Sequence, residues 1–221
     1  MKAMILAAGF GTRLKPLTDT MPKALIPFKS RPLITHQIER LKSTGIDEIV
    51  VNVHHHIDKM MEFFDQNDFG IKIDLIIEES KILGTGGGIL NAKDFLSAEP
   101  FVVINVDIST DFNLNELIDS FNKEQPFAAI AVQKRNTKRG LVLDKDMRMT
   151  GIQNEESDPD NVYAFNCMHV ISNDIFNQGI DVKFCGIFDI YKEMIKKGKI
   201  ISGYDTGECY FKDLGKIENL N

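Results

Sequence analysis

This sequence has few cysteines, no long apolar run and no excess of positive charge. Its 221 residues include three cysteines, Cys167, Cys185 and Cys209, which form no CxxC pair and no even framework, so a reducing cytoplasm is the expected location. The first apolar run is shorter than a signal peptide requires, and no run reaches the length of a transmembrane helix. The net charge of −6 argues against general attraction to nucleic acid or an anionic membrane. Any phosphate must therefore bind at a local site.

The first 133 residues alternate short buried-strand patterns with helical patterns. Such alternation predicts βαβ units and a mostly parallel sheet, as in Rossmann-like three-layer α/β folds. The predicted strands are 3–6, 48–53, 71–77, 101–104 and 127–132. The predicted helices are 32–44, 57–64, 88–96 and 114–121, and residues 84–87 are expected to form a loop that leads into the third of them.

The rhythm changes after residue 133. A turn at 144–146 lies between two short extended runs, which indicates a hairpin within 139–152. A further strand is expected at 162–171 and a helix at 188–195. Two strands, 199–204 and 208–211, are expected to meet at a turn over 205–207. No linker-like composition separates the two parts. We therefore expect one domain over 1–221, with a nucleotide-binding half (about 1–133) and a smaller, substrate-facing half (about 134–221).

A glycine-rich loop at residues 9–23 follows the first strand directly. Glycines in this place let the backbone approach an anion and present N–H groups to it. A dinucleotide-binding GxGxxG would need glycine where Leu14 stands, and the P-loop pattern GxxxxGK[ST] is absent. Instead Arg13 and Lys23 flank the loop, and both cations suit phosphate groups. The loop is predicted to bind a triphosphate and a second phosphate; an ordinary turn with surface charges is the alternative.

One aspartate is well placed to hold a divalent cation. Asp107 comes just after the buried strand 101–104, where ligands bind in open parallel sheets, so it could hold Mg²⁺ bridging phosphates or cap the next helix. Asp111 resembles the cap of that helix more closely. Asp213 is by itself a plain helix-cap candidate.

Two further motifs are less informative. The glycines at 84–88 indicate close approach of the backbone to a flat or charged group, or a flexible loop with no ligand. His54, His55 and His56 alternate in direction at the end of a strand and cannot all chelate one metal, so a metal site there is not expected.

Together these motifs resemble the sugar-1-phosphate nucleotidylyltransferase family. The resemblance rests on LAAGFGTRLKPLTDTMPKAL, VVNVHHH, ILGTGGGI, INVDISTDF and YFKDLGKIENL, and it spans residues 1 to about 220. It implies a Rossmann-like fold and an enzyme that transfers a nucleoside monophosphate from a triphosphate to a sugar 1-phosphate. It is closest to N-acetylmuramate-1-phosphate uridylyltransferases, which would use UTP in cell-wall synthesis. Mannose-1-phosphate guanylyltransferases, which use GTP, are the alternative.

The resemblance also assigns roles to residues. It implies Arg13 and Lys23 as catalytic cations, with Lys23 on the sugar phosphate and the α-phosphate, and Asp107 and Asp213 as Mg²⁺ ligands. It implies nucleotide binding by Ala8, Gly9, Gly11, Thr12, Arg13, Gly86 and Gly87. Asn166 and Cys167 are expected beside the sugar phosphate, although the family usually has glycine where Cys167 stands. Lys216 replaces a threonine of the family's C-terminal pattern.

Two other functions compete with this interpretation. A cytidylyltransferase for phosphocholine would share the opening loop, but the GTGGGI loop speaks against it. A catalytically silent regulatory relative would have lost charged residues that are all present here. The expected partners are the two substrates alone, with no nucleic acid and no membrane, and the chain is expected to be a monomer or a homodimer.

Overall fold

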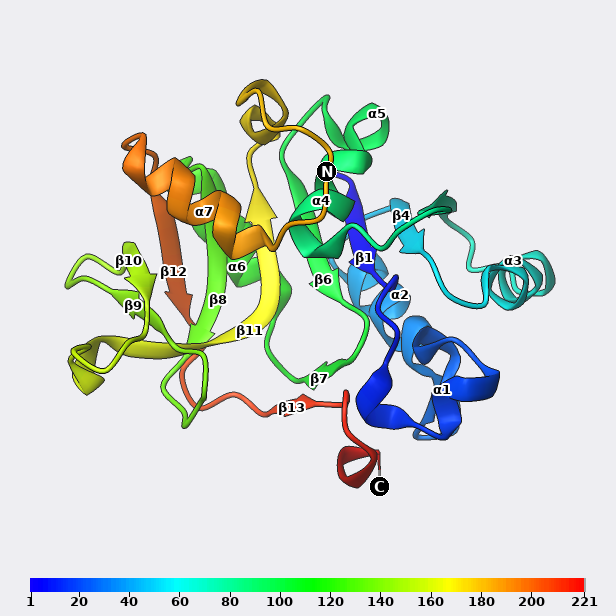
Figure 1. The fold of residues 1–221 in the computed structure, drawn as a ribbon. Coiled ribbons are helices and arrows are strands. Elements are labelled where there is room, and N and C mark those ends of the chain that lie inside the picture. Colours follow the sequence, from blue (N-terminus) through cyan, green and yellow to red (C-terminus); the bar gives the residue numbers. More distant parts are fainter. Residues whose placement is uncertain (221) are drawn as a thin grey trace.

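A nine-stranded mixed sheet runs through the whole protein, with helices on both of its faces (Figure 1). The structure is a computed structural model, and it describes residues 1–220. Figure 1 shows the early, blue-to-cyan part of the chain at one end of the sheet and the later, yellow-to-orange part towards the other end. The two predicted halves therefore share one continuous sheet.

Four neighbouring strands, from the middle of the sheet to one of its edges, form a parallel block. It consists of β1 (Ala3–Leu6), β4 (Glu48–Val53), β5 (Lys72–Ile77) and β6 (Phe101–Asn105), with β1 between β4 and β6. β1 and β6 are almost entirely buried and apolar, as expected of parallel strands covered on both faces. Parallel pairing places the carboxyl ends of β1, β4 and β6 along one edge, and this edge carries the glycine loop and Asp107.

An antiparallel strand joins the second half to this block. β11 (Val162–Ile171) pairs antiparallel with both β6 and β8 (Ala128–Gln133). The predicted hairpin is confirmed as β9 (Leu141–Leu143) and β10 (Met149–Ile152). The sheet is thus mixed, and parallel pairing is confined to the four-stranded block and to one further pair, β8 with β12 (Ile201–Asp205).

The last two strands do not form the predicted pair. β12 lies parallel to β8, and β13 (Phe211–Asp213) instead pairs antiparallel with β7 (Ile108–Thr110). The turn at 205–207 separates two strands of different sheets. The prediction was wrong because turn chemistry fixes a change of direction but not the partner of each strand. A third small sheet joins β2 (Pro27–Phe28) to β3 (Arg31–Pro32).

Helices cover the sheet from both sides, and alternate residues of the strands feed two cores. Ala3 and Ile5 of β1 belong to one core with α2 (Leu33–Ser43), α3 (Ile57–Gln66) and α6 (Leu114–Glu124). Met4 belongs to the other core, with α4 (Gly84–Asn91), α5 (Lys93–Leu96) and α7 (Ile187–Lys196). The period of two along the strand explains this division. The remaining helical segments are α1 (Leu17–Thr20) and the 3₁₀ turns η1 (Thr12–Leu14), η2 (Lys23–Leu25), η3 (Pro159–Asn161), η4 (Asn173–Asn177) and η5 (Ile217–Asn219).

Three local predictions need correction. Residues 84–87 are the first turn of α4, not a loop that leads into it. α6 is capped by Asn113, whose side chain accepts a hydrogen bond from Asn115 N, whereas Asp111 accepts one from Tyr210 N. Asp213 is the last residue of β13 and caps no helix. Within residues 1–220, no helix combines the length and apolar character needed to cross a bilayer.

Candidate active site

The glycine loop presents free backbone N–H groups at the end of β1. Among the described residues, the amides of Ala8, Gly9, Phe10 and Gly11 donate to no protein acceptor. Gly9 is exposed, and a Cβ placed on it would meet nothing within 4 Å. A run of unpartnered amides beside open space is a suitable anion site.

Gly11 gives the loop its shape. Its φ of 62° lies in the left-handed region, and a Cβ there would come within 2.8 Å of the Thr18 methyl carbon. Its carbonyl accepts hydrogen bonds from Leu14 N (2.8 Å) and the Thr18 hydroxyl (3.0 Å). The backbone therefore turns sharply into η1, which places Thr12 and Arg13 in exposed positions beside the loop.

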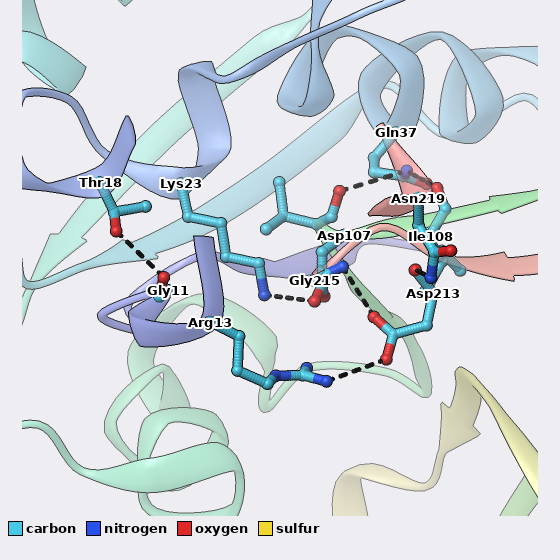
Figure 2. A network of polar contacts seen from close by, with 11 residues as sticks. Gly11, Arg13, Thr18, Lys23, Gln37, Asp107, Ile108, Asp213, Gly215 and Asn219 are labelled. Atoms are coloured by element: carbon cyan, nitrogen blue, oxygen red, sulfur yellow. Dashed lines mark hydrogen bonds and ion pairs between the residues drawn. The ribbon is translucent and has the colours of Figure 1, made fainter. Parts of the chain in front are cut away.

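Lys23 and Asp107 form an ion pair next to this loop (Figure 2). Lys23 begins η2, and Asp107 follows β6, the strand adjacent to β1. Both side chains are mostly buried, with 14% of Lys23 and 11% of Asp107 exposed. A cation and a carboxylate are thus held together at the carboxyl edge of the parallel block, where open α/β sheets bind ligands.

The second pair of charges is more open to solvent. Arg13 Nη1 lies 3.4 Å from Asp213 Oδ2, and the two side chains are 55% and 44% exposed. Strand β13 places Asp213 here because it pairs with β7, so that Asp213 lies opposite Ile108, the residue after Asp107. Leu214 N also donates to Asp107 O at 2.8 Å, which fixes this join.

The two carboxylates converge at Gly215. A Cβ built on Gly215 would lie 2.8 Å from Asp107 Oδ2 and 2.8 Å from Asp213 Oδ1, and 2.6 Å from an Arg13 nitrogen. Gly215 N donates to Asp213 Oδ1, as Figure 2 shows. Any side chain at 215 would fill the space between the aspartates. The four charged residues predicted from the sequence therefore meet in one place.

This arrangement fits a magnesium ion that is shared with phosphates. Mg²⁺ is usually held in such sites by one or two carboxylates, with phosphate and water oxygens completing its shell. Asp107 and Asp213 supply two such carboxylates, and residues 1–220 contain no group of three or more His, Cys, Asp and Glu side chains suited to a metal. The protein thus offers a partial set of ligands that substrate would complete.

Gly86 and Gly87 have a packing role in the structure. A Cβ at Gly87 would lie 2.1 Å from Lys183 O, and one at Gly86 would lie 2.9 Å from Gly186 O. Cys185 O accepts hydrogen bonds from Gly86 N at 3.0 Å and from Gly87 N at 3.4 Å. The glycines let α4 approach the chain that leads into α7. Their binding to a nucleobase stays a prediction.

Asn166 and Cys167 lie on β11, in an irregular stretch of the strand. In the pairing of β11 with β8, residues 166–168 lie opposite the single residue Ala131. Cys167 has a φ of +59°, which explains why glycine suits this position. Burial raises the pKa of the Cys167 thiol to about 12, helped by the carboxylates of Asp107 and Asp213. Cys167 therefore stays a neutral thiol close to the carboxylates of Asp107 and Asp213. Asn166 is fully buried and points its amide at Arg135 and Thr206.

A buried polar chain connects the glycine loop to α4. Ala7 N donates to Asn52 Oδ1 (2.9 Å), Asn52 Nδ2 donates to Glu78 Oε1 (2.7 Å), and Leu83 N donates to Glu78 Oε2 (2.7 Å). Asn52 and Glu78 are 2% and 3% exposed. Sequence analysis missed this chain, although an asparagine inside the apolar strand VVNV was a usable signal, because buried polar groups need partners.

The three histidines border the glycine loop. His54 Nδ1 hydrogen-bonds Glu78 O at 2.6 Å, and His56 Nε2 lies 3.3 Å from Thr18 O. The exposed Phe10 ring contacts His54 and His55 edge-on. Desolvation lowers the pKa of His55, with the neighbouring histidines adding to the effect. The histidines support the loop from the end of β4.

Fold and site define the class of this protein. The family model for Nucleotidyl transferase matches residues 2–153, so the chain belongs to that family. Its relatives and structural neighbours are sugar-1-phosphate nucleotidyltransferases, as the sequence resemblance implied.

The individual relatives match over part of their length. Mannose-1-phosphate guanylyltransferase 1 of Arabidopsis thaliana is 40% identical over 151 residues, which cover 65% of this chain and 41% of the relative. Mannose-1-phosphate guanyltransferase of Aspergillus oryzae is 38% identical, over 66% of this chain and 41% of its own length. The chain thus spans about two fifths of these relatives. The inositol-1-phosphate CTP transferase of T. maritima has the same fold, with a TM-score of 0.83, 19% identity, and coverage of 100% of this chain and 91% of its own.

Proposed function

We propose that this protein transfers a nucleoside monophosphate from a nucleoside triphosphate to a sugar 1-phosphate and releases pyrophosphate. The observation that carries the proposal is the convergence of Lys23, Asp107, Arg13 and Asp213 beside a loop with unpartnered amides. This reaction brings together three anionic groups: the sugar phosphate, the α-phosphate and the leaving pyrophosphate. The site supplies fixed N–H donors, two cations and two carboxylates that could hold a metal. Family membership supports the same reaction.

GTP and mannose 1-phosphate are the proposed substrates. Sequence motifs alone favoured UTP and N-acetylmuramate 1-phosphate, but the first relatives are named mannose-1-phosphate guanylyltransferases or guanyltransferases, so the alternative fits better. A role in cell-wall synthesis has no support from these relatives. The proposed division of labour places the triphosphate on residues 1–133 and the acceptor sugar phosphate on the rest of the chain.

The mechanism requires positioning and charge neutralisation more than acid–base chemistry. The attacking oxygen of the sugar phosphate is already an anion, and it displaces pyrophosphate at the α-phosphorus in line. In this proposal Arg13 and the loop amides neutralise the leaving pyrophosphate, and Lys23 neutralises the α-phosphate. Bound to Asp107 and Asp213, Mg²⁺ would neutralise phosphate charge on both substrates. Both cations are paired with these carboxylates in the structure, so each can transfer to phosphate as substrate arrives.

Release of pyrophosphate tests the proposal directly. Four triphosphates should be crossed with mannose 1-phosphate, N-acetylmuramate 1-phosphate, glucose 1-phosphate and phosphocholine, with Mg²⁺ present. We expect the highest kcat/KM for GTP with mannose 1-phosphate. Turnover with UTP and N-acetylmuramate 1-phosphate alone would reverse the substrate assignment. No release with any pair would favour the silent regulatory relative.

A further inference from the structure

Arg135 is an exposed cation whose side chain is held in place. It lies two residues after β8, and its Nη2 donates to Asn166 Oδ1 at 3.0 Å and to Phe165 O at 2.9 Å. Its guanidinium carbon lies 4.3 Å from the centre of the Phe211 ring. Exposed arginines are normally free to adopt many rotamers, so three contacts on one guanidinium indicate a fixed orientation.

A buried polar side chain supports this orientation. Asn166 is 0% exposed; besides accepting from Arg135, it donates to Thr206 Oγ1 at 2.9 Å, and Thr206 Oγ1 donates to Val132 O at 3.1 Å. A buried amide destabilises the fold unless its hydrogen bonds are made. Here two of them are used, and one of the two aims a guanidinium. The irregular stretch of β11 that contains Asn166 thus has a definite effect at the surface.

The guanidinium faces the proposed catalytic centre. Its contacts place it there, because Asn166 is adjacent to Cys167 and Phe211 lies two residues before Asp213 on β13. Desolvation lowers the pKa of Arg135, while Cys167, Asp213 and Cys209 act in the opposite direction. The same proximity acts on the Cys167 thiol, whose pKa is raised by Asp107 and Asp213 and lowered by Arg135. Arg135 therefore lies close to Cys167 and to the segment of β13 that carries Asp213.

One side of the guanidinium has no protein partner. Within residues 1–220, Arg135 Nη1 donates to no acceptor, and Arg135 forms no salt bridge, because Asp213 pairs with Arg13 instead. β11 and β6 separate β8 from β1 (Figure 1), so Arg135 and the glycine loop follow strands that are not neighbours in the sheet. A fixed guanidinium with free donors suits phosphate or carboxylate, which it can bind through two parallel hydrogen bonds.

We propose that Arg135, oriented by Asn166 and stacked on Phe211, binds an anionic group of the acceptor sugar phosphate. The inference rests on the proposed function, and it adds a residue that positions the acceptor opposite the triphosphate loop. The anion has two possible sources. One is the phosphate common to all acceptors, and the other is a carboxylate on the sugar, as in N-acetylmuramate.

Arg135→Gln tests the inference, with Arg135→Lys as the charge-retaining variant. We expect Arg135→Gln to raise the acceptor KM about tenfold or more, with the KM for the triphosphate unchanged and kcat within about threefold. Arg135→Lys should recover part of the loss. Lys134→Gln is the matched control, since the neighbouring Lys134 donates to Asp160 O and lies over the Tyr163 ring. A purely structural role would instead lower the melting temperature and raise both KM values.

A binding measurement separates this inference from the proposed function. Mannose 1-phosphate and N-acetylmuramate 1-phosphate are titrated calorimetrically in the presence of Mg²⁺ and a non-hydrolysable GTP analogue, and the titration is repeated with a UTP analogue. Weaker binding of both acceptors to Arg135→Gln identifies the phosphate as the anion; weaker binding of the second alone identifies its carboxylate. Equal Kd values in wild type and Arg135→Gln, or no acceptor binding to wild type, would overturn the inference. The pyrophosphate assay decides the proposed function independently.

Discussion

Two ion pairs at the site differ in how firmly the fold holds them. Lys23, at the start of η2, and Asp107, just after β6, are mostly buried. Arg13 and Asp213 are about half exposed. Asp107 follows directly from a buried strand. Asp213 reaches the site through β13, a short strand that pairs with β7 outside the main sheet. The buried core thus fixes the Lys23–Asp107 pair. The Arg13–Asp213 pair depends instead on the small two-stranded sheet of β13 and β7.

The family match covers the buried pair but only one residue of the exposed pair. Residues 2–153 match the family model, and they contain the glycine loop with Arg13, Lys23 and Asp107. Asp213, Asn166 and Cys167 lie beyond that match. The reaction with the triphosphate demands one geometry of phosphates, while the acceptor pocket can vary with the sugar. We therefore expect the buried pair Lys23–Asp107 to determine which reaction is catalysed, and residues beyond 153 to determine which acceptor is used.

The largest expected effect comes from exchanging each carboxylate for its amide. Asp107→Asn and Asp213→Asn should each lower kcat about 10²–10³-fold, because each removes a proposed metal ligand next to the transferring phosphate. Only Asp107→Asn should also lower the melting temperature, since it leaves Lys23 mostly buried beside an uncharged partner. Pyrophosphate release and thermal unfolding measure the two effects. Near-normal release by Asp107→Asn would sink the metal assignment, and equal shifts in melting temperature would erase the contrast between the pairs.

The two cations should differ in the same direction. We expect Lys23→Ala to lower kcat about 100-fold, because Lys23 is held close to the α-phosphate position. Arg13→Ala should lower it about tenfold, because its exposed charge is screened and the loop amides still bind the leaving pyrophosphate. Initial rates at saturating substrate provide the test, with Lys15→Ala, an exposed cation of the same loop paired with Asp19, as the control. A larger loss for Arg13→Ala would reverse the comparison.

Sequence reasoning succeeded where residues adjacent in sequence act together. The glycine loop, the strand before it and the position of Asp107 all follow from local patterns, and the structure places the predicted charges around one point. The role of Asp213 came from family resemblance alone, because the pairing of β13 with β7 joins segments that are distant in sequence. Turn residues at 205–207 predicted a hairpin that tertiary pairing overrode.

Residues whose role depends on distant partners were missed. The Asn52–Glu78 chain and the orientation of Arg135 require contacts between separate strands, which no local pattern encodes. The glycines of α4 were assigned to a loop because glycine disfavours helix interiors. The structure shows that close approach to residues 183–186 outweighs that preference.

Acid should weaken the second half of the sheet through His169 on β11. This side chain is buried, its Nδ1 lies 2.9 Å from Tyr191 Oη, and desolvation lowers its pKa to about 3. In the unfolded chain His169 takes up a proton near pH 6.5, whereas in the folded chain it stays neutral down to about pH 3. The free energy of unfolding therefore falls as the pH drops from about 6.5 towards 3, by up to about 1.4 kcal/mol per pH unit. Urea unfolding at pH 7 and pH 5 should show this loss, and His169→Gln should reduce it. An unchanged slope in His169→Gln would place the acid sensitivity elsewhere.

The smallest effect is expected at Cys167, where backbone shape and side-chain packing oppose each other. A φ of +59° disfavours any residue with a Cβ by about 1–3 kcal/mol, and Cys167→Gly removes that strain. It also removes a partly buried thiol and adds backbone freedom to the unfolded chain, so the net change in unfolding free energy should stay within about 1 kcal/mol. Cys167→Val, with a β-branched side chain, should lose about 2 kcal/mol or more. Urea unfolding of both variants checks this order. Equal destabilisation of the two variants would mean that packing of the thiol dominates at this position. Cysteine would then stand in the irregular stretch of β11 because its side chain packs well there, and backbone strain would be the smaller effect.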